Sequence, residues 1–254
     1  MNANEMVGEK LAELAVAFGL LTRLPVPRLL LPAVGARSDA VWAYPLVGAA
    51  VGAIGGAVYW LAHGFSCPPA LAAFWALAAM ILVTGALHED GLADFADGLA
   101  GRTREQSLAI MRDHQIGTYG VIALVLSLVV RSTAIALIAE PGAVIAALMA
   151  AGAASRLSAV LLMAALPHAR SDGLSVAVGR PSARLAAAAF GLTFAMCWLL
   201  LPFGVALLVV LSAGLGAIAI GRMVLTRLGG QTGDVLGASS QLCECLALTV
   251  LAIA

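Results

Sequence analysis

The residues best suited to chemistry form one acidic stretch that begins at His88. Within it, Asp90, Asp94 and Asp97 are spaced so that a helix would place all three carboxylates on one face. Three carboxylates held that close repel one another unless a cation neutralises them, and hard oxygen ligands of this kind suit Mg²⁺. We therefore predict a Mg²⁺ site, whose candidate ligands are Asp90, Asp94, Asp97 and Glu89. The alternative is a solvated loop that binds nothing.

Two further polar segments contain candidates for phosphate binding. Residues 111–120 include Arg112 and His114, which can hold phosphate, and His114 can also move a proton. Residues 229–234 place glycines ahead of Thr232 at the start of an expected helix, where free N–H groups can cradle an anion. Each segment has a structural alternative, which is a helix-start turn for the first and a capped helix for the second.

Three charged residues fall inside apolar stretches, namely Arg131, Arg156 and Glu244. Charges in such stretches are expensive and usually functional, although a buried ion pair with an acid is the structural alternative. With the polar segments they give one set of candidate substrate-binding residues: Arg23, Arg112, Asp113, His114, Tyr119, Arg131, Arg156, Arg170, Thr232, Asp234 and Glu244.

The composition indicates what must position these residues. Of the 254 residues, 62% are apolar and 11% are charged, against roughly 25% charged in ordinary soluble domains. The net charge is zero, which argues against a nucleic-acid partner. No charged residue occurs between Asp39 and Glu89 or between Arg184 and Arg222. Each gap has room for two membrane helices of about 20 residues, so we predict an all-α, polytopic membrane helix bundle.

Seven transmembrane helices are predicted, with breaks at Pro, Gly and charged residues: 40–61, 70–87, 117–139, 143–166, 185–201, 204–223 and 235–254. Ahead of them, residues 5–21 mix charged and apolar side chains in a pattern that predicts an amphipathic helix at the membrane interface. We expect a single integral membrane domain over 1–254. Residues 1–39 would form a cytoplasmic interfacial segment, and 88–116 would form an acidic cytoplasmic loop that carries the active site.

The connections between these spans fall into two sets. The short connections at 63–69, 140–142 and 202–203 contain no Lys or Arg. The N-terminal segment and the remaining connections carry most of the basic residues. Because basic loops stay in the cytoplasm, we predict a cytoplasmic N-terminus and a C-terminus on the other side.

Five motifs in a fixed order resemble those of the cobalamin synthase family, also called adenosylcobinamide-GDP ribazoletransferases. They are FGLLTRLPVP at 18–27, YPLVG at 44–48, DGLADFADGL at 90–99, MRDHQIGTYG at 111–120 and GGQTGDVLG at 229–237. The resemblance covers the chain nearly end to end. The sequence departs from it at Glu89, where an apolar residue is expected, and at His114-Gln115, where Ser-Arg is commoner.

The resemblance implies a Mg²⁺-dependent transferase of the bacterial inner membrane that completes the nucleotide loop of vitamin B12. A ribose hydroxyl of α-ribazole, or of its 5′-phosphate, would attack the phosphate of adenosylcobinamide-GDP, and GMP would leave. Arg112 and Arg170 would hold phosphate oxygens, while His88 or one acid of the cluster would accept the hydroxyl proton. The implied partners are these substrates and the lipid bilayer. A homo-oligomer, or association with other enzymes of cobalamin assembly, stays open.

Two alternative functions fit parts of the pattern. Residues 94–102 resemble the first half of the CDP-alcohol phosphotransferase signature, but Met111, Gln115 and Tyr119 stand where its second half requires Gly, Asp and Asp. A transporter could place Arg131, Arg156 and Glu244 along a path. However, the acids cluster at one membrane face, which speaks against a transporter.

Overall fold

The computed structural model describes residues 3–27, 37–113 and 115–254, and within them it contains helices and no strand. The predicted all-α class is therefore confirmed. The helices are α1 (Ala3–Leu21), the 3₁₀ helix η2 (Arg37–Ala43), α2 (Tyr44–Gly64), α3 (Pro69–Thr84), α4 (Leu87–Gly98), α5 (Arg104–Ile110), α6 (Thr118–Ile138), α7 (Pro141–Ala165), α8 (Leu174–Val178), α9 (Ala183–Leu200), α10 (Phe203–Leu228) and α11 (Gly233–Ile253).

In the described part of the chain, six helices are long and apolar enough to cross a membrane by themselves, and a bent pair gives a seventh crossing if it counts as one span. The six are α6, α7, α9, α10, α11 and the helix that runs over Ser38–Gly64. This matches the predicted multi-pass bundle of about seven spans. The difference lies at the predicted span 70–87. Here α3 has 16 residues, or about 24 Å, which is shorter than a hydrocarbon core of about 30 Å.

The bent pair consists of α3 and α4, which meet at 90°. The turn depends on Gly85 and Ala86, which both have positive φ, at 63° and 57°. An alanine rarely adopts this conformation, so the surrounding packing must hold it. The bend directs α4 into the bundle, and most of its residues are buried. Residues 88–116, which the sequence predicts to be a loop, therefore contain two helices, α4 and α5.

Helix α7 lies at the centre of the bundle. Of its most apolar 18-residue window, 78% is buried, compared with 22% in α9 and 28% in α6. It packs most extensively on α2, where Gly48, Gly52 and Gly56 recur every fourth residue. A Cβ atom on Gly48 would collide with the backbone carbonyl of Gly152 on α7. Glycine is thus what lets the two backbones come this close, as in other membrane helix pairs.

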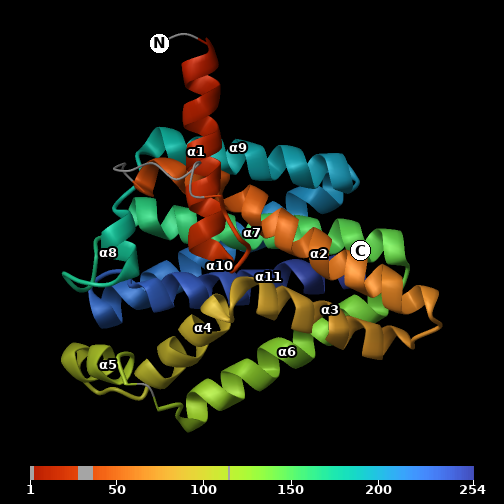
Figure 1. The fold of residues 1–254 in the computed structure, drawn as a ribbon. Coiled ribbons are helices and arrows are strands. Elements are labelled where there is room, and N and C mark those ends of the chain that lie inside the picture. Colours follow the sequence, from red (N-terminus) through yellow and green to blue (C-terminus); the bar gives the residue numbers. More distant parts are fainter. Residues whose placement is uncertain (1–2, 28–36, 114) are drawn as a thin grey trace.

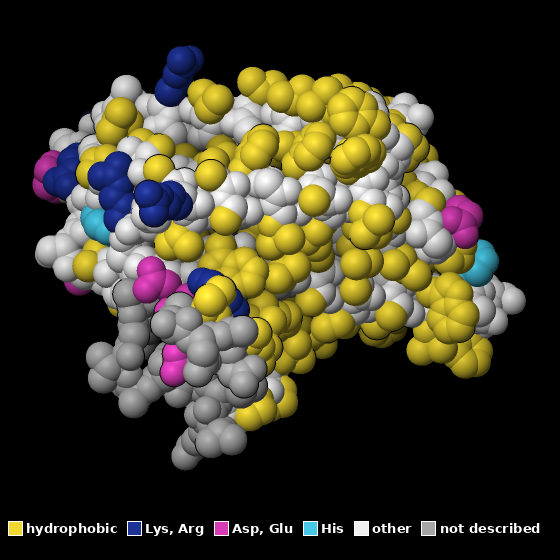
Figure 2. Space-filling model, turned by 90° about the horizontal axis from the view of Figure 1, so that it is seen from above, with side chains coloured by type: hydrophobic (Ala, Val, Ile, Leu, Met, Phe, Trp, Pro, Cys, Tyr) yellow, Lys and Arg dark blue, Asp and Glu magenta, His cyan; other side chains and the backbone are white. Residues whose placement is uncertain are grey.

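The two ends of the bundle differ. In Figure 1 the α2–α3, α6–α7 and α9–α10 connections and the C-terminus lie toward one end, whereas α5 and α8 lie toward the other. Figure 2 shows a broad hydrophobic face whose Lys and Arg side chains gather at one end, in line with a bilayer along the sides. Helix α1 stands across the direction of the spans, as expected of an interfacial helix (Figure 1).

The α2–α7 contact generates a prediction about stability. We expect Gly48→Ala to lower the stability of the folded protein by about 1–3 kcal/mol, because the added methyl group overpacks the contact. Thermal unfolding of the purified protein in detergent would measure the effect. Gly191→Ala on α9 is the matched control, since a Cβ atom there meets nothing within 4 Å. Equal unfolding midpoints for the two variants would contradict the account.

Candidate active site

A cavity of about 280 Å³ lies where α1, α4, α7, α8 and α11 meet. One part of its wall is apolar, and the other part carries polar and charged groups. The apolar side chains include Leu20, Leu21, Met163, Leu174 and Val178. The polar side chains include His88, Asp90, Arg156, Arg170 and Asp234. The structure thus brings five of the predicted site residues together around one space.

Helices α4 and α11 form the polar side, and two glycines bring their backbones together. A Cβ atom on Gly91 would lie 3.1 Å from the Cα atom of Asp234, and one on Gly237 would lie 3.3 Å from the Cα atom of Gly91. This close approach places the first turn of α4 beside the first turn of α11. His88 is 4% exposed, and its Nδ1 atom has no hydrogen-bond partner in the described part of the chain. Asp90, by contrast, is exposed.

The start of α11 holds the second acid of the cavity. Thr232 caps the helix, because its hydroxyl oxygen accepts a hydrogen bond from the backbone N–H of Val235 at 3.3 Å. The same hydroxyl donates to Asp234, which also forms a 3.1 Å ion pair with Arg170. The side chains of Arg170 and Asp234 are 15% and 20% exposed, so this pair is more open to solvent than His88.

A network of four charges is buried beside the cavity. Glu244 on α11 accepts hydrogen bonds from Arg156 on α7 at 2.7 Å and from Arg131 on α6 at 3.3 Å. Arg131 also donates to Glu89 on α4 at 3.2 Å, and Gln241 donates to the same Glu89 oxygen at 2.9 Å. The two acids and two arginines balance in charge. The buried ion pair that the sequence left open is therefore present, and it joins four helices.

This network changes the expected roles of its members. Arg131 and Glu244 are each 1% exposed and neither lines the cavity, so the structure places them within the network and away from the cavity wall. One oxygen of Glu89 accepts from both Arg131 and Gln241, and its other oxygen has no hydrogen-bond partner in the described part of the chain. Arg156 alone belongs to both the network and the cavity wall.

The carboxylate of Asp97 binds the start of α6. One carboxylate oxygen accepts from the backbone N–H of Gly117 at 2.7 Å, and the other accepts from that of Gly120 at 2.9 Å. These groups lie at the start of α6, where N–H groups have no partner within the helix. A Cβ atom on Gly117 or Gly120 would run into this carboxylate. Both glycines thus serve the contact between α4 and α6.

The predicted three-acid metal site is not assembled. Within the described residues, no three His, Cys, Asp or Glu side chains are grouped closely enough to hold a metal ion. Burial along α4 separates the acids, because Asp90 is exposed, Asp94 is half-buried and Asp97 is buried beneath α6. Asp90 and Asp94 remain, one helical turn apart. A pair of carboxylates still fits Mg²⁺, which usually takes one or two carboxylates and completes its shell with water and substrate phosphates.

The other predicted residues lie away from the cavity wall. Arg112 forms an exposed ion pair with Asp172 at 2.6 Å, and Asp113 accepts from the backbone N–H of Gln115 at 3.2 Å. Tyr119 is 60% exposed, and the guanidinium of Arg23 lies against Gly85 in the α3–α4 turn. His114 lies outside the described residues.

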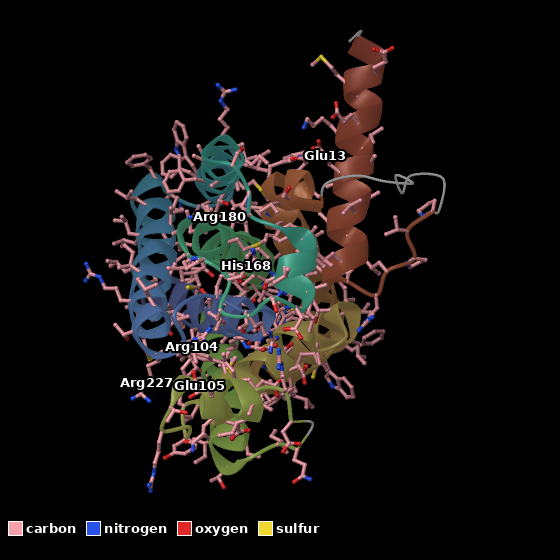
Figure 3. The ribbon with its side chains drawn as sticks, turned by 90° about the vertical axis from the view of Figure 1, so that its left-hand side faces the viewer. Glu13, Arg104, Glu105, His168, Arg180 and Arg227 are labelled. Carbon is pink, nitrogen blue, oxygen red and sulfur yellow. The ribbon has the colours of Figure 1, made fainter. Side chains whose placement is uncertain are left out.

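A set of backbone contacts closes the end of the bundle near the cavity. The backbone N–H of Gln231 donates to the Pro167 carbonyl at 2.8 Å, and that of Ala169 donates to the Gln231 carbonyl at 2.9 Å. Arg104 on α5 donates to the carbonyls of Leu228 and Ala169. Figure 3 looks onto this end and shows Arg104 below His168. The glycines at 229–230 therefore serve this junction, since a Cβ atom on Gly230 would meet the Pro167 carbonyl.

Several contributors to the site were missed from the sequence. Gln241 looks like one more polar residue in a span, and nothing in its spacing indicates Glu89 as its partner. The sequence also does not predict the apolar wall from α1 and α8, because Leu20 and Val178 resemble any other apolar residue of the chain. The sequence feature that points to α8 is the pair Gly173 and Gly179, which flank this short helix.

These features define an integral membrane protein with a ligand cavity at one end, walled by aspartates, arginines and a buried histidine. The sequence pattern of the family described as cobalamin-5-phosphate synthase matches residues 13–252, and the chain belongs to that family. No solved structure matches the chain.

Relatives of known name agree with this assignment. A protein of Bradyrhizobium diazoefficiens named adenosylcobinamide-GDP ribazoletransferase is 45% identical, over 98% of this chain and 96% of its own length. Proteins with the same name from Mesorhizobium japonicum and Rhizobium johnstonii are 42% and 41% identical. These two alignments cover 96% and 94% of this chain, and 94% and 95% of the respective relatives.

The buried network generates a second prediction. We expect Glu244→Gln to destabilise the protein by about 3–5 kcal/mol, because it leaves Arg131 and Arg156 with one uncompensated buried charge. Thermal unfolding in detergent would measure this. Glu105→Gln is the matched control, since the Glu105 side chain is 77% exposed and lies 3.9 Å from Arg104. A Glu244→Gln protein as stable as the control would show that the network contributes little.

Proposed function

We propose that this chain joins adenosylcobinamide-GDP to α-ribazole, or to its 5′-phosphate, and releases GMP. The product is adenosylcobalamin or its 5′-phosphate. The names of the relatives support this assignment over nearly the whole chain. The structural observation that carries it is the placement of the accessible acid Asp90 beside Arg170 and the buried imidazole of His88, around one cavity.

The proposed reaction is a phosphoryl transfer. The ribose hydroxyl oxygen forms a new bond to the phosphorus attached to cobinamide. The bond from that phosphorus to the bridging oxygen of the pyrophosphate breaks, and GMP leaves with the bridging oxygen. The hydroxyl proton passes to a base. His88 is our candidate, because an imidazole nitrogen without a partner can accept a proton, and its Nδ1 atom is such a nitrogen in the described structure.

We also propose that the reaction depends on Mg²⁺. When bound, Mg²⁺ would neutralise the pyrophosphate and stabilise the departing GMP. Asp90 and Asp94 are the residues that would hold it, since Asp90 is exposed and lines the cavity and Asp94 lies one helical turn further along α4. Arg170 lies in the same cavity wall and would hold phosphate oxygens, whereas Arg112 lies in an exposed ion pair and is the weaker candidate.

We further propose that the protein lies in the bacterial inner membrane with the cavity end toward the cytoplasm. The basic connections support this orientation, because they lie at the end that carries α5 and α8. The N-terminus is then cytoplasmic and the C-terminus lies outside. Both substrates would approach from the cytoplasm. A homo-oligomer, or association with other enzymes of cobalamin assembly, is compatible with the exposed apolar faces of α6 and α10.

The acids of α4 give a direct test. We expect Asp90→Asn and Asp94→Asn each to lower turnover at least about 100-fold, because each removes one charge from the proposed metal pair. The assay measures GMP released by purified protein from adenosylcobinamide-GDP, α-ribazole and Mg²⁺. Asp113→Asn is the matched control, since Asp113 is exposed and lies outside the cavity. Near-normal turnover in both α4 variants would refute the assignment.

Asp97 should behave differently from its two neighbours. Asn at this position keeps one acceptor oxygen, so Asp97→Asn should lose one of the two hydrogen bonds to the start of α6. We expect a loss of about 1–3 kcal/mol in stability, and protein that still folds should retain measurable turnover. An Asp97→Asn protein of normal stability and no activity would instead make Asp97 a catalytic residue.

A further inference from the structure

We infer that the cavity is the binding site of the acceptor nucleoside, and that its apolar wall, formed by Leu20, Leu21, Met163, Leu174 and Val178, selects the base. This inference rests on the proposed function and adds to it which of the two substrates the cavity takes. Three properties of the cavity carry it, namely its size, its charge and the chemistry of its wall.

The size fits one nucleoside. Small-molecule sites usually have volumes of about 300–1,000 Å³, and this cavity, at about 280 Å³, is just below that range. A ribose with one bicyclic base is a ligand of this size. A corrinoid is several times larger, so the bulk of the donor must lie outside the cavity. The base and ribose of the acceptor, or the guanosine of the donor, are then the remaining candidates for its interior.

The charges of the wall argue against the guanosine diphosphate half of the donor. The charged side chains that line the cavity are two aspartates and two arginines. Both arginines are already paired, Arg170 with Asp234 at 3.1 Å and Arg156 with Glu244 at 2.7 Å. Apart from the reacting phosphate, which Arg170 would contact, the wall therefore offers no net positive charge for a further phosphate such as that of GMP. The uncharged acceptor α-ribazole needs no such charge, so the wall favours it over its 5′-phosphate.

The chemistry of the wall separates the two bases. Guanine carries hydrogen-bond donors and acceptors along its edge, and these groups would lose water against the apolar wall without gaining partners. The benzimidazole of α-ribazole has an apolar edge, so it can lie against leucine, methionine and valine without that cost. The polar side offers groups suited to a ribose instead. His88 and Ser240 line the same cavity.

Helix α8 holds part of this wall in a fixed position. Gly173 and Gly179 flank it and have φ values of 99° and 87°, which residues with a side chain rarely adopt. The helix between them brings Leu174, Ser175 and Val178 to the cavity. Val178 is 5% exposed, so a larger side chain there has to extend into the cavity or displace α8. This makes position 178 suitable for changing the shape of the site.

The test compares the two substrates of one enzyme. We expect Val178→Phe to raise the KM for α-ribazole about tenfold or more, while the KM for adenosylcobinamide-GDP changes less than twofold. Val125→Phe on α6 is the matched control, because Val125 is 53% exposed on the outer surface of the bundle. A rise in the donor KM with an unchanged acceptor KM would overturn the inference and place the donor in the cavity.

Two further measurements keep the result clear if Val178→Phe fails to fold. Val178→Ala should raise the relative kcat/KM for benzimidazole ribosides with bulkier ring substituents by about tenfold, and an unchanged preference would count against the inference.

Equilibrium dialysis with α-ribazole and with GMP, each without donor, tests the site directly. If wild-type protein shows no turnover but binds α-ribazole, and Val178→Ala alters that binding, the proposed function fails while the cavity assignment stands. If GMP binding responds to Val178→Ala and α-ribazole binding does not, the assignment fails.

Discussion

Glu244 lies between Arg131 and Arg156 in the apolar interior of the bundle, and Arg131 also reaches Glu89. Removing any one of these charges from water costs several kcal/mol, so each is tolerable only while its partners stay in place. The four residues lie on α4, α6, α7 and α11. The requirement that all four charges remain paired therefore fixes how these helices meet, and it does so at one side of the cavity.

The site follows from that arrangement. Helix α4 is short and turns by 90° from α3, so it cannot be held in place by spanning the membrane itself. Glu89 binds it to Arg131, Asp97 binds it to the start of α6, and Gly91 lets it lie against α11. These contacts leave His88 and Asp90 at the cavity. The first and last acids of this short helix, Glu89 and Asp97, thus hold it in place, and an inactive variant of α4 must be tested for folding before a role is assigned.

Much of the fold could be predicted from the sequence, because the spacing of charges in an apolar chain records which segments lie in lipid. The all-α class and the multi-pass bundle of about seven spans follow from it, although the segment predicted as the span 70–87 is the short helix α3 and the bend into α4. The roles of the acids did not. Helical spacing placed Asp90, Asp94 and Asp97 on one face, but it could not show that α6 covers the far end of that face. Glu89 and Glu244 needed partners from distant helices, and pairing across the bundle leaves no local pattern.

If the buried charges hold α4 in the bundle, then their loss should free this helix. Hydrogen exchange of the backbone amides of α4 tests this most directly. The measurement compares wild-type protein with Arg131→Met, which keeps an unbranched apolar side chain but removes the charged guanidinium. We expect amides in 87–98 to exchange much faster in the variant, while those of α2 and α7 stay protected by their own close contact. Unchanged protection of α4 would contradict the account, and so would an equal loss of protection in every helix.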